Sequence, residues 1–324
     1  MQTASDKNYA AAFSKFGEPD NVEVIERPMP IAGPGEVLVR VAAATVNPTD
    51  ALMLTGAHAA LMKDLAPPYI AGMEFAGHVH HAEEGSDALA VGQPVMGIVN
   101  PRRPSGGAHA RFIAVPLASV APLTGQLDLA EAATIPMNGL TAKMCMERLD
   151  LPAGATLFVT GAAGAVGGYV VQLAREAGLR VVADGQPCDV SMLQSLGAAA
   201  VVPRGEGFEA AVRALVPHGV DGLVDCAVLG GAAAALVRAG GMMVSLRRTQ
   251  VVSDPRIRYA TISVLEQATN SEALRWLAER YCEGSLLPRV AMRLPVTRAG
   301  EAFNLVKHGG LRGRVVLVFN APST

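Results

Sequence analysis

Three glycines recur at every third position of one segment: Gly161, Gly164 and Gly167. They follow the apolar run LFV and precede an uncharged helical run in TLFVTGAAGAVGGYVVQLAREAGLRVVADG, residues 156–185. Glycines at this spacing let the backbone turn tightly after a strand, approach a pyrophosphate and pack a helix against the sheet. The N–H groups and the dipole at the amino end of that helix favour an anion without a basic side chain. The segment therefore predicts a bound dinucleotide.

The same segment has a second interpretation as a membrane span. Residues 156–174 carry no charged side chain, so a hydropathy scan would select them. Four glycines, however, cluster where a spanning helix should be continuous, and Arg175 and Glu176 follow at once. The arrangement of strand, turn and helix favours the dinucleotide, and we expect no transmembrane segment.

Two patterns of secondary structure divide the 324 residues. Before residue 125, short alternating strands such as EVLVRVAAATV and QPVMGIV are separated by glycine and proline, which predicts an antiparallel, partly barrel-like domain. From residue 129, helices alternate with apolar strands, which predicts a doubly wound parallel sheet. The last part holds an amphipathic helix, SEALRWLAERYCEG, and a closing strand, RVVLVF. We expect residues 1–128 and 268–324 to form one domain and residues 129–267 the other.

Composition and charge limit the classes of function. Half of the residues are hydrophobic, and the excess is alanine, valine and glycine, which suits a soluble α/β protein with buried parallel strands. The net charge is −2 and no run rich in lysine or arginine occurs, so neither nucleic acid nor an anionic membrane is an expected partner. The opening MQTASDKNYAAAF lacks a basic region followed by an apolar stretch. We therefore expect no secretory signal and a cytoplasmic location.

Cysteine and histidine spacing does not predict a metal site. The four cysteines are scattered along the chain: Cys145, Cys188, Cys226 and Cys282. No pair has Cys-x-x-Cys spacing, so we expect buried reduced thiols rather than disulfides or a zinc lobe. The densest histidine group is His78, His80 and His81, and no carboxylate or cysteine partner for it is identifiable.

Four further motifs occur in a fixed order around the glycine segment. They are GPGEVLVRVAAATVNPTD (33–50), PYIAGMEFAGHV (68–79), NGLTA (138–142) and LRGRVVLVF (311–319). With these motifs the chain resembles the medium-chain dehydrogenase/reductase superfamily, specifically its zinc-free quinone oxidoreductase (zeta-crystallin-like) branch. The resemblance implies a Rossmann-type doubly wound parallel sheet plus a GroES-like, partly barrel-shaped antiparallel β domain. It also implies a homodimer.

The resemblance also indicates which metal ligands are missing. Zinc alcohol dehydrogenases of this superfamily bind a catalytic metal through a cysteine near the first motif, a histidine before a glutamate, and a later cysteine or acid. Here residues 45–47 contain no cysteine, Met73 precedes Glu74, and no four-cysteine lobe follows Val99. Without thiolate or imidazole ligands there is no Lewis acid to polarise an alcohol, so alcohol oxidation is disfavoured.

The choice of dinucleotide depends on the end of the glycine segment. Asp184 lies 20 residues after Gly164, where an acid normally accepts from the ribose 2′-OH of NAD. By resemblance, however, the position that reads the adenosine is Gly185, on the other face of the strand. Gly185 and Gln186 leave room for a 2′-phosphate that Arg204 could bind, although Arg204 is otherwise a solvated loop charge. We therefore expect NADPH, with NADH as the alternative that Asp184 favours.

In the resembled branch, nicotinamide lies between the domains and gives hydride to a quinone or an α,β-unsaturated carbonyl. Asn47 matches the asparagine beside the nicotinamide, and Thr141 matches a threonine that contacts the cofactor. Asn47 could instead serve only the turn before Pro48. His58 stands where some relatives carry a tyrosine proposed as proton donor, but a loop histidine is often incidental and solvent is the alternative donor. Asp50 is expected to fix the loop.

The resemblance thus implies catalytic roles for Asn47, His58 and Thr141. The residues expected to bind the cofactor are Asn47, Thr141, Gly161, Ala163, Gly164, Ala165, Val166, Gly167, Asp184, Gly185, Gln186, Arg204, Cys226, Ser245, Leu246, Arg247 and Arg312. Four arginines follow the strand GGMMVSL: Arg247, Arg248, Arg256 and Arg258. They could hold an anionic substrate such as an acyl thioester with a phosphate-bearing handle, or they could be solvated loop or subunit-edge charges.

Three functions follow from these expectations. The leading hypothesis is a zinc-independent, NADPH-dependent reductase of a small-molecule quinone or enone. The second is an enoyl-thioester reductase acting on acyl-CoA or polyketide substrates, for which the arginines are the only indication. The third is an NADPH-binding protein without turnover, which the uncertain proton donor allows.

Overall fold

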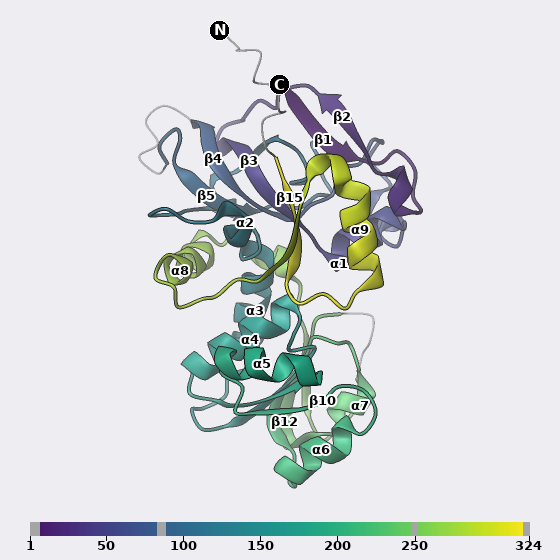
Figure 1. Ribbon diagram of the computed structural model, residues 1–324, viewed down its shortest axis with the longest axis vertical. Helices are drawn as coiled ribbons and strands as arrows, with labels where there is room; N and C mark the ends of the chain where they lie inside the picture. Colours follow the sequence, from purple (N-terminus) through teal and green to yellow (C-terminus); the bar gives the residue numbers. More distant parts are fainter. Residues whose placement is uncertain (1–6, 83–88, 248–251, 320–324) are drawn as a thin grey trace. The chain divides into compact units, whose positions relative to one another are not determined.

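The computed structural model describes residues 7–82, 89–247 and 252–319 and divides into two compact units (Figure 1). The first unit is Met1–Met137 with Leu265–Thr324, and the second is Asn138–Val264. The two ends of the chain thus belong to one unit. The divisions fall within helix α3 (Pro136–Leu149) and at the start of the 3-10 turn η5 (Val264–Gln267), whereas we placed them before residues 129 and 268.

The first unit is built on a seven-stranded sheet. In sheet order its strands are β14 (Val290–Pro295), β15 (Arg314–Val318), β3 (Glu36–Val46), β4 (Glu74–Ala82), β5 (Pro94–Ile98) and β7 (Val120–Pro122), with β6 (Phe112–Pro116) paired to β3. All of these pairs are antiparallel except β14 and β15, which run parallel. The expected antiparallel GroES-like domain is confirmed, and over the described residues its sheet does not close into a barrel.

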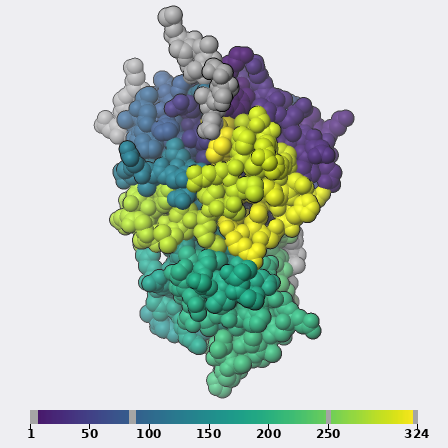
Figure 2. Space-filling view, in the orientation of Figure 1, coloured from purple at the N-terminus to yellow at the C-terminus, as the bar shows by residue number. Residues whose placement is uncertain are grey.

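Helices and a hairpin cover this sheet. They are α1 (Pro48–Leu54), α2 (Leu129–Ala132), α8 (Ser271–Cys282), α9 (Ala299–His308) and the hairpin of β1 (Asn8–Ala12) with β2 (Glu23–Arg27). Short 3-10 turns are η1 (Pro19–Asn21), η2 (Ala59–Met62), η3 (Leu117–Ser119) and η6 (Val296–Arg298). Helix α9 packs on α1 and β15, and Figure 2 shows this late segment, in yellow, against the purple amino-terminal one. An ion pair between Lys307 and Glu18 joins the same two segments.

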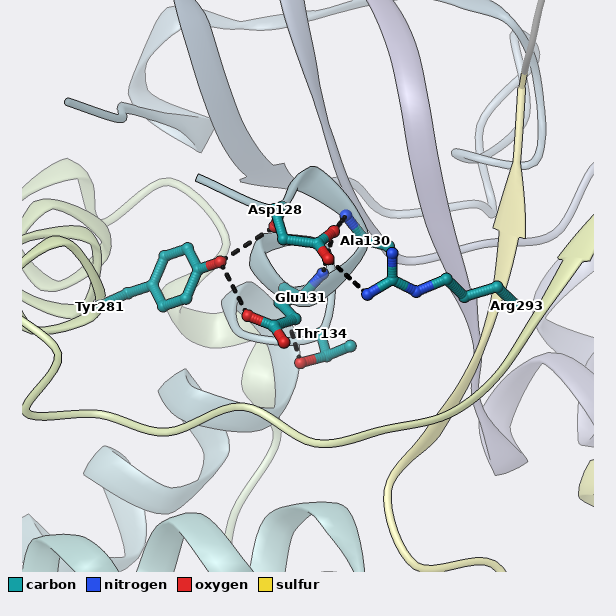
Figure 3. Close-up of polar contacts among 6 residues, drawn as sticks. All are labelled: Asp128, Ala130, Glu131, Thr134, Tyr281 and Arg293. Carbon is teal, nitrogen blue, oxygen red and sulfur yellow. Dashed lines mark hydrogen bonds and ion pairs between the residues drawn. The ribbon is translucent and has the colours of Figure 1, made fainter. Parts of the chain in front are cut away.

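A polar cluster ties the late helix α8 and strand β14 to the first half of the chain (Figure 3). The Tyr281 hydroxyl donates to the backbone carbonyl of Asp128 (2.9 Å) and approaches the Glu131 carboxylate (3.3 Å). The Asp128 carboxylate caps α2 by accepting from Ala130 N (2.8 Å) and also pairs with Arg293. These bonds join residues about 150 positions apart, on either side of the segment that forms the second unit, and so hold together the two parts of the chain that make up the first unit.

The second unit is a six-stranded parallel sheet in the order β10-β9-β8-β11-β12-β13. The strands are β8 (Thr156–Thr160), β9 (Arg180–Gly185), β10 (Ala200–Pro203), β11 (Val220–Asp225), β12 (Val237–Ser245) and β13 (Arg258–Thr261). The chain winds outward in one direction from β8 to β10 and then returns to add β11, β12 and β13 on the other side. This order is the doubly wound arrangement, so the Rossmann-type prediction is confirmed.

Helix α3 precedes the first strand of the second unit, and the other helices of this unit follow its strands. These others are α4 (Ala165–Glu176), α5 (Val190–Leu196), α6 (Phe208–Leu215), α7 (Gly231–Ala234) and the 3-10 turn η4 (Pro187–Asp189). In α4 the residues from Val166 to Ala174 are all buried, which explains the apolar composition of this segment. Among the described residues, no helix combines the length and the apolarity needed to cross a bilayer.

Candidate active site

The three glycines of the opening motif shape the turn between β8 and α4. Gly161 has a positive φ of 61°, which L side chains rarely adopt. A Cβ atom on Gly167 would lie 2.4 Å from the Gly161 carbonyl oxygen, so only glycine lets α4 approach the turn this closely. Gly164 is the N-cap of α4 and has no side chain to cap its first N–H groups. The turn and this helix end therefore fit a pyrophosphate.

The glycine turn lies where the strand order reverses, between β8 and β11. A Cβ on Gly161 would sit 3.4 Å from the Cβ of Cys226, the residue after β11. The buried Asp225 carboxylate accepts from the Thr160 hydroxyl (2.7 Å) and from Gly230 N (2.9 Å). These bonds hold the carboxyl ends of the two central strands together at the switch point, where open α/β sheets bind ligands. The residues expected from the sequence did not include Asp225 or Thr160. The signal for Asp225 was an acid at the end of an apolar strand.

The two residues at the end of β9 face opposite sides, as the alternation of a strand requires. Asp184 is buried, and its carboxylate accepts from Ala162 N in the glycine turn (3.0 Å). Burial raises the pKa of Asp184, while backbone N–H groups of the turn and the Arg204 guanidinium oppose that rise. A Cβ on Gly185, in contrast, would meet Leu193 Cδ1 at 2.7 Å. Leu193 therefore occupies the space that a side chain at position 185 would need.

Most other residues predicted to bind the cofactor belong to the second unit. Ala163, Ala165 and Val166 lie in the glycine turn and the first turn of α4, and Thr141 lies in α3. Gln186 precedes η4, and Arg204 N donates to the Gly185 carbonyl (3.1 Å), which puts Arg204 beside the end of β9. Ser245, Leu246 and Arg247 follow one another at the end of β12. Arg312, like Asn47, belongs to the first unit, and its guanidinium donates to the Gly310 carbonyl (2.7 Å).

Asn47 joins a buried polar cluster in the first unit. Its side-chain amide donates to the Thr45 hydroxyl oxygen (2.8 Å) and to the Glu74 carboxylate (3.0 Å). Thr45 also donates to Glu74 (2.6 Å), and Met137 N donates to the other Glu74 oxygen (2.8 Å). An amide group has two N–H bonds, and both are directed inward here. In this structure Asn47 therefore holds the loop between β3 and α1, and its place beside a nicotinamide stays a prediction.

Glu74 is the centre of this cluster and was not among the expected site residues. Burial raises the pKa of its carboxyl, and the hydrogen bonds from Thr45 and Asn47 oppose that rise. The available signal was an acid followed directly by the apolar residues Phe75 and Ala76 at the start of a strand. Asp50 behaves as predicted, because its carboxylate accepts from Asn47 N (2.8 Å) and Gly72 N (3.0 Å) and so fixes the loop.

His109 lies beneath the same loop and was also missed. Its ring is completely buried, with Nε2 2.8 Å from the Thr45 carbonyl oxygen, so Nε2 carries the proton. Nδ1 has no hydrogen-bond partner among the described residues, and the ring packs edge-on against Phe303. Burial lowers the pKa of His109, although the Asp50 carboxylate opposes this. His109 is therefore held neutral.

We predict that His109 makes the stability of the protein depend on pH. Because the folded-state pKa of His109 lies below the ordinary histidine value of about 6.5, the unfolded chain takes up a proton before the native state does. The free energy of unfolding should therefore fall as the pH falls below about 6.5, by at most about 1.4 kcal/mol per pH unit for this group. Urea unfolding between about pH 8 and about pH 5 measures that slope, and His109→Gln should flatten it. The exposed His81→Gln is the matched control, and equal slopes for wild type and His109→Gln would contradict the assignment.

His58, the candidate proton donor, lies at the start of η2 in the first unit and is half-buried. Burial and the nearby Arg102 guanidinium lower its pKa, and Asp50 opposes them. His58 therefore lies close enough to Asp50 to sense its charge. A lowered pKa reduces the protonated fraction at neutral pH, which favours solvent as the source of the proton.

The four arginines after β12 differ in what they contact. Arg256 is paired with Asp254 (2.6 Å), and Arg258 begins β13. Arg247 is exposed, and Arg248 lies outside the described residues. Because the Arg256 guanidinium already has a carboxylate partner, it offers little support for a substrate phosphate site.

Comparisons with known proteins identify the family. Residues 33–125 match the family model of the alcohol dehydrogenase GroES-like domain, and residues 196–317 match that of the zinc-binding dehydrogenase. Together they cover about two thirds of the chain, one on each side of the glycine turn. The chain belongs to the medium-chain dehydrogenase/reductase superfamily. It is accordingly an oxidoreductase, and the resemblance inferred from its motifs is confirmed.

Named members of the superfamily are similar over most of the chain. The 2-methylene-furan-3-one reductase of Solanum lycopersicum is 29% identical over 95% of this chain and 78% of its own length. The chloroplastic NADPH-dependent alkenal/one oxidoreductase of Arabidopsis thaliana is 28% identical over 87% of this chain and 72% of its own. The structure of the quinone oxidoreductase from Coxiella burnetii superposes with a TM-score of 0.86 at 23% identity, covering 97% of this chain and all of that one, which shows the shared fold.

The residues present do not fit the zinc ion that the name of one family model implies. Met73 occupies the expected histidine position, and its thioether sulfur accepts from the Thr49 hydroxyl (3.5 Å). Within the described ranges, no three His, Cys, Asp or Glu side chains are grouped to hold a metal.

The four cysteines are all free thiols. Cys145 is buried, Cys226 and Cys282 are half-buried, and Cys188 is exposed. Our expectation of buried thiols was therefore wrong for Cys188.

Proposed function

We propose that this oxidoreductase uses NADPH, without zinc, to reduce a quinone or an α,β-unsaturated carbonyl. The observation that carries the proposal is the glycine turn at the switch point of the parallel sheet. This turn is so tight that a Cβ atom on Gly167 would lie 2.4 Å from the Gly161 carbonyl oxygen. The donor set around Met73 supports independence from zinc, because a thioether is a poor ligand for that ion. The names of the tomato and Arabidopsis relatives support the substrate class.

A nicotinamide cofactor would supply hydride to the carbon conjugated with the carbonyl. The residues of this chain would bind and orient it. The amino end of α4 and the turn before it would hold the pyrophosphate, and Asp184 and Arg204, at the end of β9, would bind the adenosine ribose. Negative charge that develops on the carbonyl oxygen requires a proton, and the lowered pKa of His58 favours solvent over imidazole as its source.

The proposal is tested by incubating the purified protein with NADPH and a panel of quinones, enones and enoyl thioesters. We expect loss of reduced-nicotinamide absorbance with a quinone or an enone. Preference for thioesters would instead favour an enoyl-thioester reductase. Binding of NADPH without oxidation by any member of the panel would sink the proposal and leave a non-catalytic binding protein. Full activity after dialysis against a zinc chelator is the expected result for independence from zinc.

We predict that Arg204 contributes to the choice between NADPH and NADH. Its backbone is bonded to the end of β9 and its guanidinium is near enough to Asp184 to lower the pKa of that acid. Losing one charge-assisted bond to a 2′-phosphate should raise the Kd for NADPH about tenfold, or about 1.4 kcal/mol, and leave the Kd for NADH unchanged. Calorimetric titration of Arg204→Ala measures both constants. Arg180→Ala, an exposed arginine at the other end of β9, is the control; equal losses for the two cofactors would argue against a phosphate contact.

A further inference from the structure

The loop that follows β11, residues 226–230, is fixed to the ends of two strands. The Thr160 hydroxyl of β8 donates to the Asp225 carboxylate of β11 (2.7 Å), and both side chains are completely buried. Together they accept hydrogen bonds from three N–H groups of the loop, those of Ala227 (3.1 Å), Leu229 (3.0 Å) and Gly230 (2.9 Å). The backbone of the loop is therefore held by the sheet itself.

The same loop contains a strained residue. Val228 has a φ of 60°, in the left-handed region that β-branched side chains rarely adopt. Among the described residues, the other non-glycine with positive φ is Asp150, and aspartate tolerates that region far better than valine. Strained backbone of this kind persists only where surrounding bonds enforce it, and it is concentrated at active sites and ligand clamps. The bonds to Asp225 and Thr160 enforce it here.

The loop lies directly on the glycine turn. A Cβ atom on Gly161 would lie 3.1 Å from Ala227 N and 3.2 Å from the carbonyl carbon of Cys226. Because the strand order reverses between β8 and β11, these strands begin the two halves of the sheet, each of which binds one mononucleotide in a doubly wound fold. In the proposed function the end of β9, in the first half, binds the adenosine ribose. The loop after β11 therefore belongs to the half that is left for the nicotinamide mononucleotide.

Leu229 is the large apolar residue that this loop exposes. Its N–H is fixed by Asp225, and yet 40% of its surface is accessible. Leu215, at the end of α6, is exposed to the same extent, but no residue of that helix has a positive φ. Exposure alone is therefore not the signal. The signal is an exposed leucine on a strained loop that the sheet holds at its switch point.

We propose that Leu229 binds the nicotinamide ring as an apolar wall, and that Asp225 and Thr160 are positioning residues that act through Leu229 by holding its loop. This inference rests on the proposed function and deepens its cofactor site. A nicotinamide ring is flat, so an aliphatic side chain can cover one face and leave the other open to a substrate. Because the loop backbone is fixed before the cofactor arrives, binding does not have to order it.

The test compares NADPH with 2′,5′-ADP, which carries the phosphorylated adenosine ribose but no nicotinamide. In calorimetric titration, Leu229→Ala should raise the Kd for NADPH about tenfold and leave the Kd for 2′,5′-ADP unchanged. Its unfolding temperature should stay close to that of wild type, because the residue is exposed. Leu215→Ala removes an equally exposed leucine from the same unit and is the control, for which neither Kd should change.

A second pair of variants tests the positioning role of Thr160. Thr160→Val has a similar shape but lacks the hydroxyl that accepts from Ala227 N, so NADPH should bind more weakly while 2′,5′-ADP binds as before. Thr160→Ser keeps the hydroxyl and should retain wild-type affinity. In the double variant with Leu229→Ala, the loss should be no larger than that of Leu229→Ala alone, because both changes remove the same contact. Additive losses would contradict the role of Thr160.

Contrary results separate this inference from the proposed function. Equal NADPH affinity in Leu229→Ala and wild type would overturn the inference and leave the proposed reductase intact. Equal losses for NADPH and 2′,5′-ADP would also overturn it, because Leu229 would then serve the adenosine half or the fold. If wild type binds NADH but not NADPH, the proposed cofactor is wrong, and the comparison of NADH with AMP tests Leu229 in the same way. If wild type binds neither dinucleotide, both proposals fail.

Discussion

Replacing Gly167 by alanine is expected to weaken dinucleotide binding strongly and to destabilise the second unit. The added Cβ would lie 2.4 Å from the Gly161 carbonyl oxygen and 2.7 Å from Ala162 Cα, and both of these atoms are backbone. Neither can yield without moving the turn away from α4. Such overpacking typically costs about 1–3 kcal/mol, and the displaced turn should weaken NADPH binding about a hundredfold or more. Calorimetric titration measures the binding, and thermal unfolding measures the stability.

Two other glycines provide the controls for this experiment. In Gly164→Ala the new Cβ meets only the Gly161 carbonyl oxygen, at 3.0 Å, so the cost to the fold should be small. It would still obstruct the face that a pyrophosphate approaches, so NADPH affinity should fall while the unfolding temperature is nearly kept. Gly231→Ala, which meets nothing within 4 Å, should change neither quantity. Wild-type NADPH affinity in Gly167→Ala would show that the cofactor does not use this turn.

Replacing Glu74 by alanine is expected to be the most destabilising change in the first unit. The substitution removes the acceptor of three donors: the Thr45 hydroxyl, the Asn47 amide and Met137 N. Thr45 and Asn47 are buried, and an unsatisfied buried donor costs about 1–3 kcal/mol. We therefore expect a loss of about 3 kcal/mol or more in the free energy of unfolding, measured with urea on the full chain.

Two other glutamate variants test this explanation. Glu74→Gln keeps one acceptor oxygen but points an N–H₂ group at one of the donors, so its loss should be intermediate. Glu23→Ala removes an exposed glutamate from β2 and should change stability by less than about 0.5 kcal/mol. An unfolding midpoint of Glu74→Ala equal to that of wild type would show that the cluster can satisfy its donors with water.

Local patterns determined the fold class and the position of the glycine turn. The spacing of Gly161, Gly164 and Gly167 predicts a tight turn with a helix packed closely against it. This prediction needs only seven residues, because the turn and the helix are consecutive in the chain. Alternation and apolar runs likewise indicate strands, because each side chain of a strand faces the side opposite to its neighbour. Strand β3, with bounds Glu36–Val46, matches the predicted run EVLVRVAAATV residue for residue.

Contacts between residues far apart in the sequence determined the surroundings of the candidate site residues. The motif that holds Asn47 is visible in the sequence, but it does not show that the Asn47 amide donates to Glu74, 27 positions away, or that Glu74 accepts from Met137 N at a separation of 63. Leu193, on the next helix, occupies the space that a side chain at position 185 would need. A sequence states which donors, acceptors and charges exist, but whether each is satisfied inside the protein depends on packing that only the tertiary structure brings about.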